Sequence, residues 1–157
     1  MRKNTSHRPC YIFVILFIVL LSGCANPIEL IVGTYEYEDV IIADLSPEGR
    51  DYLREHKTGT EYIVEPSAFA VLQGDSEDRR TNISYKREAL DEKTIEDSYS
   101  PLKEMFDKYK DRYRYSLYDE QGEIIRYYLF QLHEDVYICK YDRADMLIFW
   151  FDKVTRK

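Results

Sequence analysis

Alternation of apolar and polar residues is clearest in the second half of the chain. Residues 112–118 alternate tyrosines with polar side chains, and residues 124–132 and 136–141 carry further aliphatic and aromatic positions. Short polar segments separate these runs and predict turns at residues 119–123, 133–135 and 142–145. Period-two patterns bounded by such segments are typical of antiparallel strands joined by hairpins. Together with the apolar residues 146–151, they predict a four-stranded antiparallel meander.

The first half of the chain carries shorter strand patterns. Residues 28–43 alternate over most of their length and predict a strand with a bulge or bend at Glu38-Asp39. Residues 74–80 are polar throughout and predict a loop. Further strands are expected at residues 60–65, 69–73 and 81–87.

Two helix starts are visible in the sequence. Ser46-Pro47 pairs a hydroxyl N-cap with proline at the first helical position and predicts a helix to about His56. Ser100-Pro101 repeats this signal, and the spacing of the apolar residues after it predicts a helix packed against the core. That stripe consists of Leu102, Met105, Phe106 and Tyr109. The charged residues 88–98 fit either a solvated helix or an open loop.

These elements predict a mainly β fold with a minor α contribution: about eight antiparallel strands with one or two helices. A sheet of this size buries one face by closing into a barrel or by folding over as a sandwich. Gly33-Thr34-Tyr35 on the first strand resembles the Gly-x-Trp motif that opens lipocalin-like barrels, with tyrosine in place of tryptophan. This resemblance favours the barrel.

The N-terminal segment follows a different pattern. Arg2, Lys3 and Arg8 precede an unbroken apolar run over residues 11–21, with no acidic residue before Cys24. A helix that spans a bilayer needs about 20 apolar residues, so this run is short for a membrane span. A basic start, a short apolar region and small residues at its end are typical of a secretion signal. We therefore expect residues 1–23 to be a signal peptide.

Leu21-Ser22-Gly23-Cys24 resembles the bacterial lipobox, in which the cysteine thiol receives a diacylglyceryl group and the preceding peptide bond is cut. The resemblance implies a mature protein that begins at lipidated Cys24, with a tether over residues 24–27 and one β-rich domain over residues 28–157. Two acyl chains anchor a protein stably. The domain would face outside the cytoplasm at the cell membrane, or at the outer membrane of a Gram-negative cell.

The charge of the chain limits its partners. Three of the 22 basic residues and none of the 29 acidic residues precede Cys24, so the mature part would carry a net charge of −10. Such a surface argues against a nucleic-acid partner. Cys10 would leave with the signal and Cys24 would carry the lipid, so Cys139 would be the one free thiol; we expect it to be a small buried apolar residue.

Catalytic and metal-binding patterns are absent from the sequence. His56 and His133 are isolated, and a zinc site needs three or four protein ligands. No glycine-rich phosphate loop or nucleophile elbow occurs. We therefore predict that the chain is not an enzyme and holds no metal or cofactor.

One predicted hairpin gathers basic and aromatic residues. Arg112, Arg114, Arg126 and Tyr127 form a candidate binding surface, since such side chains stack on sugars or anchor protein interfaces. Pairing of these arginines with acidic residues across the strands is the structural alternative. We expect a lipid-anchored extracytoplasmic module that binds a small ligand or an envelope protein, or inhibits one. The alternative is an accessory or structural subunit of a cell-envelope complex, with this hairpin or the helix at residues 102–109 as its contact.

Overall fold

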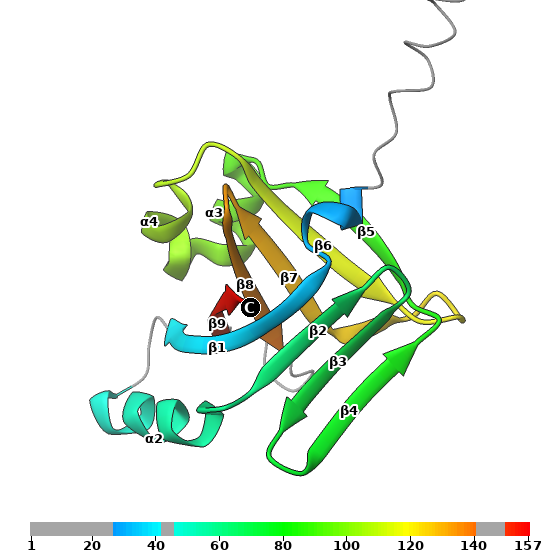
Figure 1. The fold of residues 1–157 in the computed structure, drawn as a ribbon. Coiled ribbons are helices and arrows are strands. Elements are labelled where there is room, and N and C mark those ends of the chain that lie inside the picture. Colours follow the sequence, from blue (N-terminus) through cyan, green and yellow to red (C-terminus); the bar gives the residue numbers. More distant parts are fainter. Residues whose placement is uncertain (1–26, 42–45, 141–149) are drawn as a thin grey trace, which may run out of the picture.

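A computed structural model of the protein describes residues 27–41, 46–140 and 150–157. These residues form one antiparallel sheet with the strand order β4-β3-β2-β1-β9-β8-β7-β6-β5, which curls into a half-barrel (Figure 1). The predicted mainly β, barrel-like fold is confirmed. The strands are β1 Gly33–Ile41, β2 Glu61–Glu65, β3 Ala68–Gln73, β4 Ser76–Thr81, β5 Ser84–Ala89, β6 Arg112–Tyr118, β7 Ile124–Leu132, β8 Asp135–Lys140 and β9 Trp150–Arg156.

The first and last strands pair with each other. β1 lies antiparallel to β9, from Tyr35 opposite Arg156 to Ile41 opposite Phe151. All other neighbouring strands in the sheet are consecutive in the chain, so the sheet is an up-and-down meander that is open only between β4 and β5. Across this opening the Tyr85 hydroxyl donates a hydrogen bond to the Ala68 carbonyl at 2.6 Å.

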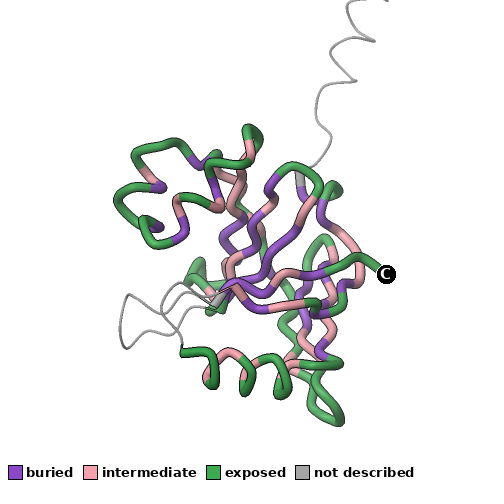
Figure 2. Tube along the Cα trace, turned by 90° about the vertical axis from the view of Figure 1, so that its left-hand side faces the viewer, coloured by how far each residue is buried: buried purple, intermediate pink, exposed green. Residues whose placement is uncertain are grey.

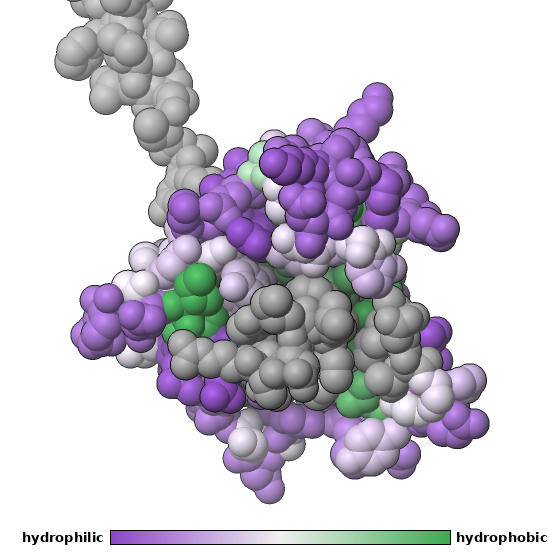
Figure 3. All heavy atoms as spheres, turned by 180° about the vertical axis from the view of Figure 1, so that it is seen from behind, coloured by the Kyte–Doolittle hydropathy of each residue, from purple (hydrophilic) through white to green (hydrophobic). Residues whose placement is uncertain are grey.

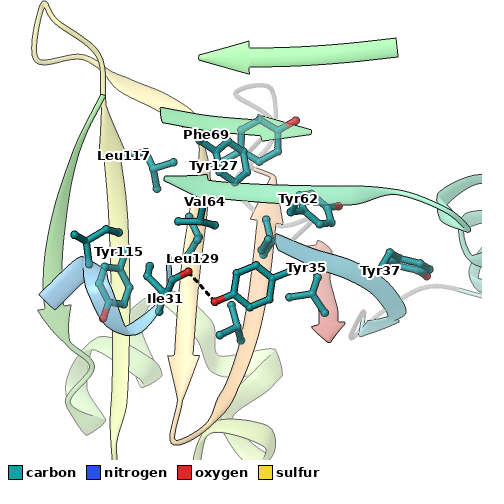
Figure 4. Close-up of a cluster of buried hydrophobic side chains, with 14 of the residues drawn as sticks. Ile31, Tyr35, Tyr37, Tyr62, Val64, Phe69, Tyr115, Leu117, Tyr127 and Leu129 are labelled. Carbon is teal, nitrogen blue, oxygen red and sulfur yellow. Dashed lines mark hydrogen bonds between the residues drawn. The ribbon is translucent and has the colours of Figure 1, made fainter. Parts of the chain in front are cut away.

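The concave face of the sheet holds the main core, because alternate residues of each strand point inward. Figure 4 shows its tyrosine, phenylalanine and aliphatic side chains meeting between the strands. The 3₁₀ helix η1, Pro27–Leu30, begins the segment that closes one mouth of the half-barrel with buried Ile28 and Ile31. The Tyr35 hydroxyl donates to the Ile31 carbonyl at 2.7 Å and fixes this plug.

A second core lies on the outer face of the sheet. Helix α3, Glu92–Tyr99, the 3₁₀ helix η2, Ser100–Leu102, and helix α4, Lys103–Phe106, pack over side chains of β7, β8 and β9. Leu102 and Phe106 are buried there, which confirms that the predicted apolar stripe faces the core. Cys139 is buried in the same cluster, as expected.

Helix α2, Pro47–Lys57, begins at the predicted Ser46 cap, whose side chain accepts a hydrogen bond from the Gly49 amide at 3.2 Å. None of its residues is buried (Figure 2). Arg54 pairs with Asp39 of β1 at 2.7 Å and ties the helix to the sheet. α2 lies at the end of the half-barrel opposite η1 (Figures 1 and 2).

Several predicted boundaries differ from the structure. The loop predicted at residues 74–80 is wrong, since Ser76–Thr81 forms β4 by pairing with β3. The first strand begins only at Gly33, because residues 27–30 form η1. The helix predicted from Ser100-Pro101 begins there as a 3₁₀ turn and continues as α4, which ends at Phe106, before Tyr109. The charged residues 88–98, which fitted a helix or a loop, contain most of α3, and the Asp91 carboxylate caps it by accepting from the Thr94 amide at 2.7 Å.

The expected bulge in β1 is confirmed by a register shift between Tyr37 and Asp39. The turn predicted at residues 142–145 and the start of the strand predicted at 146–151 lie outside the described residues, as does the predicted signal segment. Within the described part of the chain, no helix has the length and apolarity needed to cross a bilayer.

Candidate functional site

A pocket of about 220 Å³ lies at the mouth of the half-barrel beside α2. Leu53, Val71 and Ile138 supply apolar wall. Tyr62 of β2 and Tyr127 of β7 also line it, and Figure 4 shows both among the side chains of the main core. Its polar lining consists chiefly of Lys57, Thr60, Tyr62, Tyr127, Lys140 and Asp152.

Asp152 is a charged residue in the interior, with 3% of its surface exposed. The alternation of β9 turns it to the concave face together with Val154. Lys57, the last residue of α2, donates to both carboxylate oxygens at 2.6 Å, and the Tyr62 hydroxyl donates to one of them. Burial raises the pKa of Asp152, while Lys57 and Tyr62 act in the opposite direction. A buried ion pair is seldom a net source of stability, and this one lies in the lining of the pocket.

Two hydroxyls near this carboxylate have no hydrogen-bond partner among the described residues. The Thr60 hydroxyl lines the pocket, and Thr60 is only 3% exposed. The Tyr37 hydroxyl is also buried, and burial, reinforced by the Asp152 charge, raises the pKa of Tyr37 to about 12. Buried polar groups in proteins nearly always have a partner. The Thr60 hydroxyl, which lines the pocket, is therefore a group that a bound molecule can satisfy.

Tyr127 and Lys140 complete the polar lining. Tyr127 is buried against Phe69, with ring centroids 4.9 Å apart, and burial is the main cause that raises its pKa to about 12. The Lys140 ammonium lies 5.7 Å from the Tyr127 ring centroid and forms no ion pair with any described residue. The described lining therefore holds two ammonium groups and one carboxylate.

The structure divides the candidate surface of Arg112, Arg114, Arg126 and Tyr127 between two faces. Arg112 pairs with Glu92 at 2.8 Å, and Arg114 pairs with Glu88 at 2.6 Å. Both arginines therefore form ion pairs on the outer face of the sheet. Arg126 is exposed on that same face and has no ion pair with a described residue. Tyr127 points inward and reaches the pocket. His133 lies in the β7–β8 turn, as expected, with φ 57°.

Sequence reasoning did not find Asp152, Lys57 or Thr60. Asp152 and its partner Lys57 are 95 residues apart, so no local spacing links them. One signal was available, because Asp152 is two residues before Val154 on a strand and therefore shares its inward face. A carboxylate at such a position requires a buried partner.

A larger pocket, of about 530 Å³, lies near η1 and the β7–β8 turn. Two of the carboxylates that line it have partners: Glu38 accepts from Lys153 and Thr155, each at 2.8 Å, and Asp135 accepts from Tyr109 at 2.9 Å. Among residues 27–41, 46–140 and 150–157, no three His, Cys, Asp or Glu side chains are grouped for a metal ion. The pocket beside α2, with its unpartnered hydroxyl, is therefore the better candidate site.

Comparisons of the chain with protein-family models, with curated proteins and with solved structures find no match. Its function is therefore inferred from the pocket and from the first 24 residues.

Proposed function

We propose that the chain is a lipid-anchored extracytoplasmic binding module whose pocket beside α2 takes a small ligand. The observation that carries this proposal is the buried, unpartnered Thr60 hydroxyl beside the Lys57–Asp152 pair in a pocket of about 220 Å³. Pockets for drug-sized ligands measure roughly 300–1,000 Å³, so the ligand is smaller than a drug. Apolar walls with a few placed polar groups are typical of such sites.

The position of the pocket is consistent with an anchor at Cys24. The described chain begins at η1, and α2 lies at the opposite end of the half-barrel (Figures 1 and 2). A lipid on Cys24 and a tether of residues 24–27 would hold the η1 end toward the membrane. The pocket would then open away from the bilayer, toward solutes in the surrounding aqueous phase.

The alternative, an accessory subunit of an envelope complex, has less support from its two expected contact surfaces. Leu102 and Phe106 are buried against the sheet, and Arg112 and Arg114 pair with acidic residues. The large exposed apolar side chains in the described part of the chain lie on separate elements. They are Leu30, Tyr52 and Ile124. In the rear view, hydrophilic residues make up most of the coloured surface, with separate smaller hydrophobic patches (Figure 3).

Ligand-observed NMR tests the binding proposal. The full chain in nonionic detergent is screened against small molecules of neutral, cationic and anionic character. Thr60→Met places a longer side chain in the pocket and should abolish binding of any specific ligand. Thr81→Met, at an exposed position of β4, is the matched control and should leave binding unchanged. The proposal would be contradicted if the screen finds no ligand, or if the ligands that it finds bind the Thr60→Met protein as tightly as the wild-type protein.

Metabolic labelling tests the anchor. Radiolabelled palmitate should enter the wild-type protein, and Cys24→Ser should abolish labelling and release the protein from membranes. Cys10→Ser lies in the predicted signal and should leave labelling intact. A Cys24→Ser protein that still incorporates palmitate would show that Cys24 is not the lipid attachment site.

A further inference from the structure

We infer that the ligand of the pocket beside α2 is a small organic carboxylate; this inference rests on the proposed function of that pocket. The first observation is a set of hydrogen-bond donors in the lining. Lys140, Thr60 and Tyr127 all line the pocket. The Thr60 hydroxyl is buried and has no hydrogen-bond partner among the described residues, and the exposed Lys140 forms no ion pair with any of them. An ammonium and two hydroxyls together suit a ligand rich in acceptor oxygens.

The charges of the lining point to a ligand with one negative charge. Lys57 donates to both oxygens of Asp152 at 2.6 Å, so the charge of this carboxylate is already balanced. Lys140 supplies one further positive charge, in a chain whose formal net charge is −7. A single carboxylate matches it. A phosphate dianion would add a second negative charge near Asp152, at an energetic cost inside a partly desolvated pocket.

The same charges disfavour the other ligand classes. A cationic ligand would have to displace the Lys57 ammonium from Asp152 and would then lie in a pocket that also holds Lys140. A neutral ligand would form no ion pair with Lys140. Hydrogen bonds that involve a charged group are roughly twice as strong as neutral ones, so a carboxylate gains most from this lining.

The volume and walls of the pocket limit the rest of the ligand. A water molecule occupies roughly 30 Å³ of liquid, so about 220 Å³ corresponds to about seven waters. The apolar side chains of Leu53, Val71 and Ile138 and the Tyr127 ring favour a short hydrocarbon or aromatic body. The ligand is therefore a carboxylate with a compact carbon skeleton.

Paired probes on the full chain in nonionic detergent test this inference. Lactate, hexanoate and benzoate are titrated beside their neutral amides and beside inorganic phosphate, with Kd measured by NMR. At least one carboxylate should bind about 10-fold more tightly than its amide and more tightly than phosphate. Lys140→Met should weaken the binding of that carboxylate about 10-fold, whereas Lys140→Arg should keep the wild-type affinity. Lys93→Met, at an exposed position on α3, should leave it unchanged.

The outcomes separate the inference from the proposed function. The inference of a carboxylate ligand would be overturned if carboxylate and amide bind equally well, or if phosphate binds more tightly. It would also be overturned if Lys140→Met keeps the wild-type affinity and shows a normal circular dichroism melt. If a neutral or cationic compound binds, and Thr60→Met abolishes its binding, the binding function stands and the carboxylate is wrong. If no compound of any charge binds, both are wrong.

Discussion

Arg156, the last residue of β9, lies directly over Gly33, the first residue of β1. A Cβ atom on Gly33 would come within 2.8 Å of the Arg156 Nε. The Arg156 guanidinium also donates a hydrogen bond to the Val32 carbonyl. A side chain at position 33 would therefore push the Arg156 guanidinium aside. Because β1 and β9 join the two ends of the meander, this contact fastens the pair of strands on which the curl of the sheet depends.

Gly33→Ala should displace Arg156 and cost about 1 kcal/mol of unfolding free energy, the usual value of one hydrogen bond. Arg156→Ala should cost a similar amount. In the Arg156→Ala background, Gly33→Ala should be neutral or slightly stabilising, because alanine restricts the unfolded chain more than glycine does. Urea denaturation of the four proteins in a double-mutant cycle measures this coupling. Fully additive costs would show that the two residues act independently.

Asp152→Asn should destabilise the protein by about 3 kcal/mol at neutral pH, because it leaves the Lys57 ammonium in the pocket without its counter-charge. Tyr62→Phe removes one hydrogen bond to the carboxylate and should cost about 2 kcal/mol. Glu38→Gln breaks an exposed pair with Lys153 and is the control, with an expected loss below about 1 kcal/mol. Urea denaturation tests the ranking, and an Asp152→Asn protein as stable as Glu38→Gln would contradict it.

Stability should fall at alkaline pH through the buried tyrosines. The pKa values of Tyr37 and Tyr127 are raised to about 12, chiefly by burial, whereas an unfolded tyrosine titrates near pH 10. The folded state therefore holds these protons more tightly than the unfolded state. The stability that this contributes is fully present below about pH 10 and is lost as the pH rises to about 12. In a pH titration followed by near-ultraviolet absorbance, part of the phenolate signal should appear only near pH 12. Tyr37→Phe and Tyr127→Phe should each reduce the amplitude of this step. A folded protein whose tyrosines all titrate near pH 10 would refute this.

The fold could be predicted wherever burial imposes a period on the sequence. Residues 112–118 and 124–132 were predicted as strands because alternate side chains enter a core. β4 was missed because it is an edge strand with mostly exposed residues, so its sequence carries no alternation. One signal was available: Gly74-Asp75 connects Gln73 to Ser76 as a two-residue hairpin turn, with Gly74 at φ 56°.

The candidate site was less accessible to prediction, because it depends on tertiary structure. Lys57 reaches Asp152 only after β1 pairs with β9 and α2 packs beside that pair. No spacing in the sequence encodes this meeting. Tyr127 was singled out with the arginines of its hairpin, yet strand alternation turns it inward, away from them. Cys24 lies outside the described residues, and its lipidation stays a prediction.

The arginines of the hairpin give a last prediction that also bears on the site. Arg114 donates to the Tyr99 hydroxyl at 2.8 Å and pairs with Glu88, so it holds α3 against the sheet. Arg114→Met should cost about 2 kcal/mol and should speed amide hydrogen exchange in residues 92–106. Exposed Arg126 is the control, and Arg126→Met should change stability by less than about 0.5 kcal/mol. Neither variant should alter ligand binding in the pocket; loss of binding in Arg126→Met would move the binding site to the outer face of the hairpin.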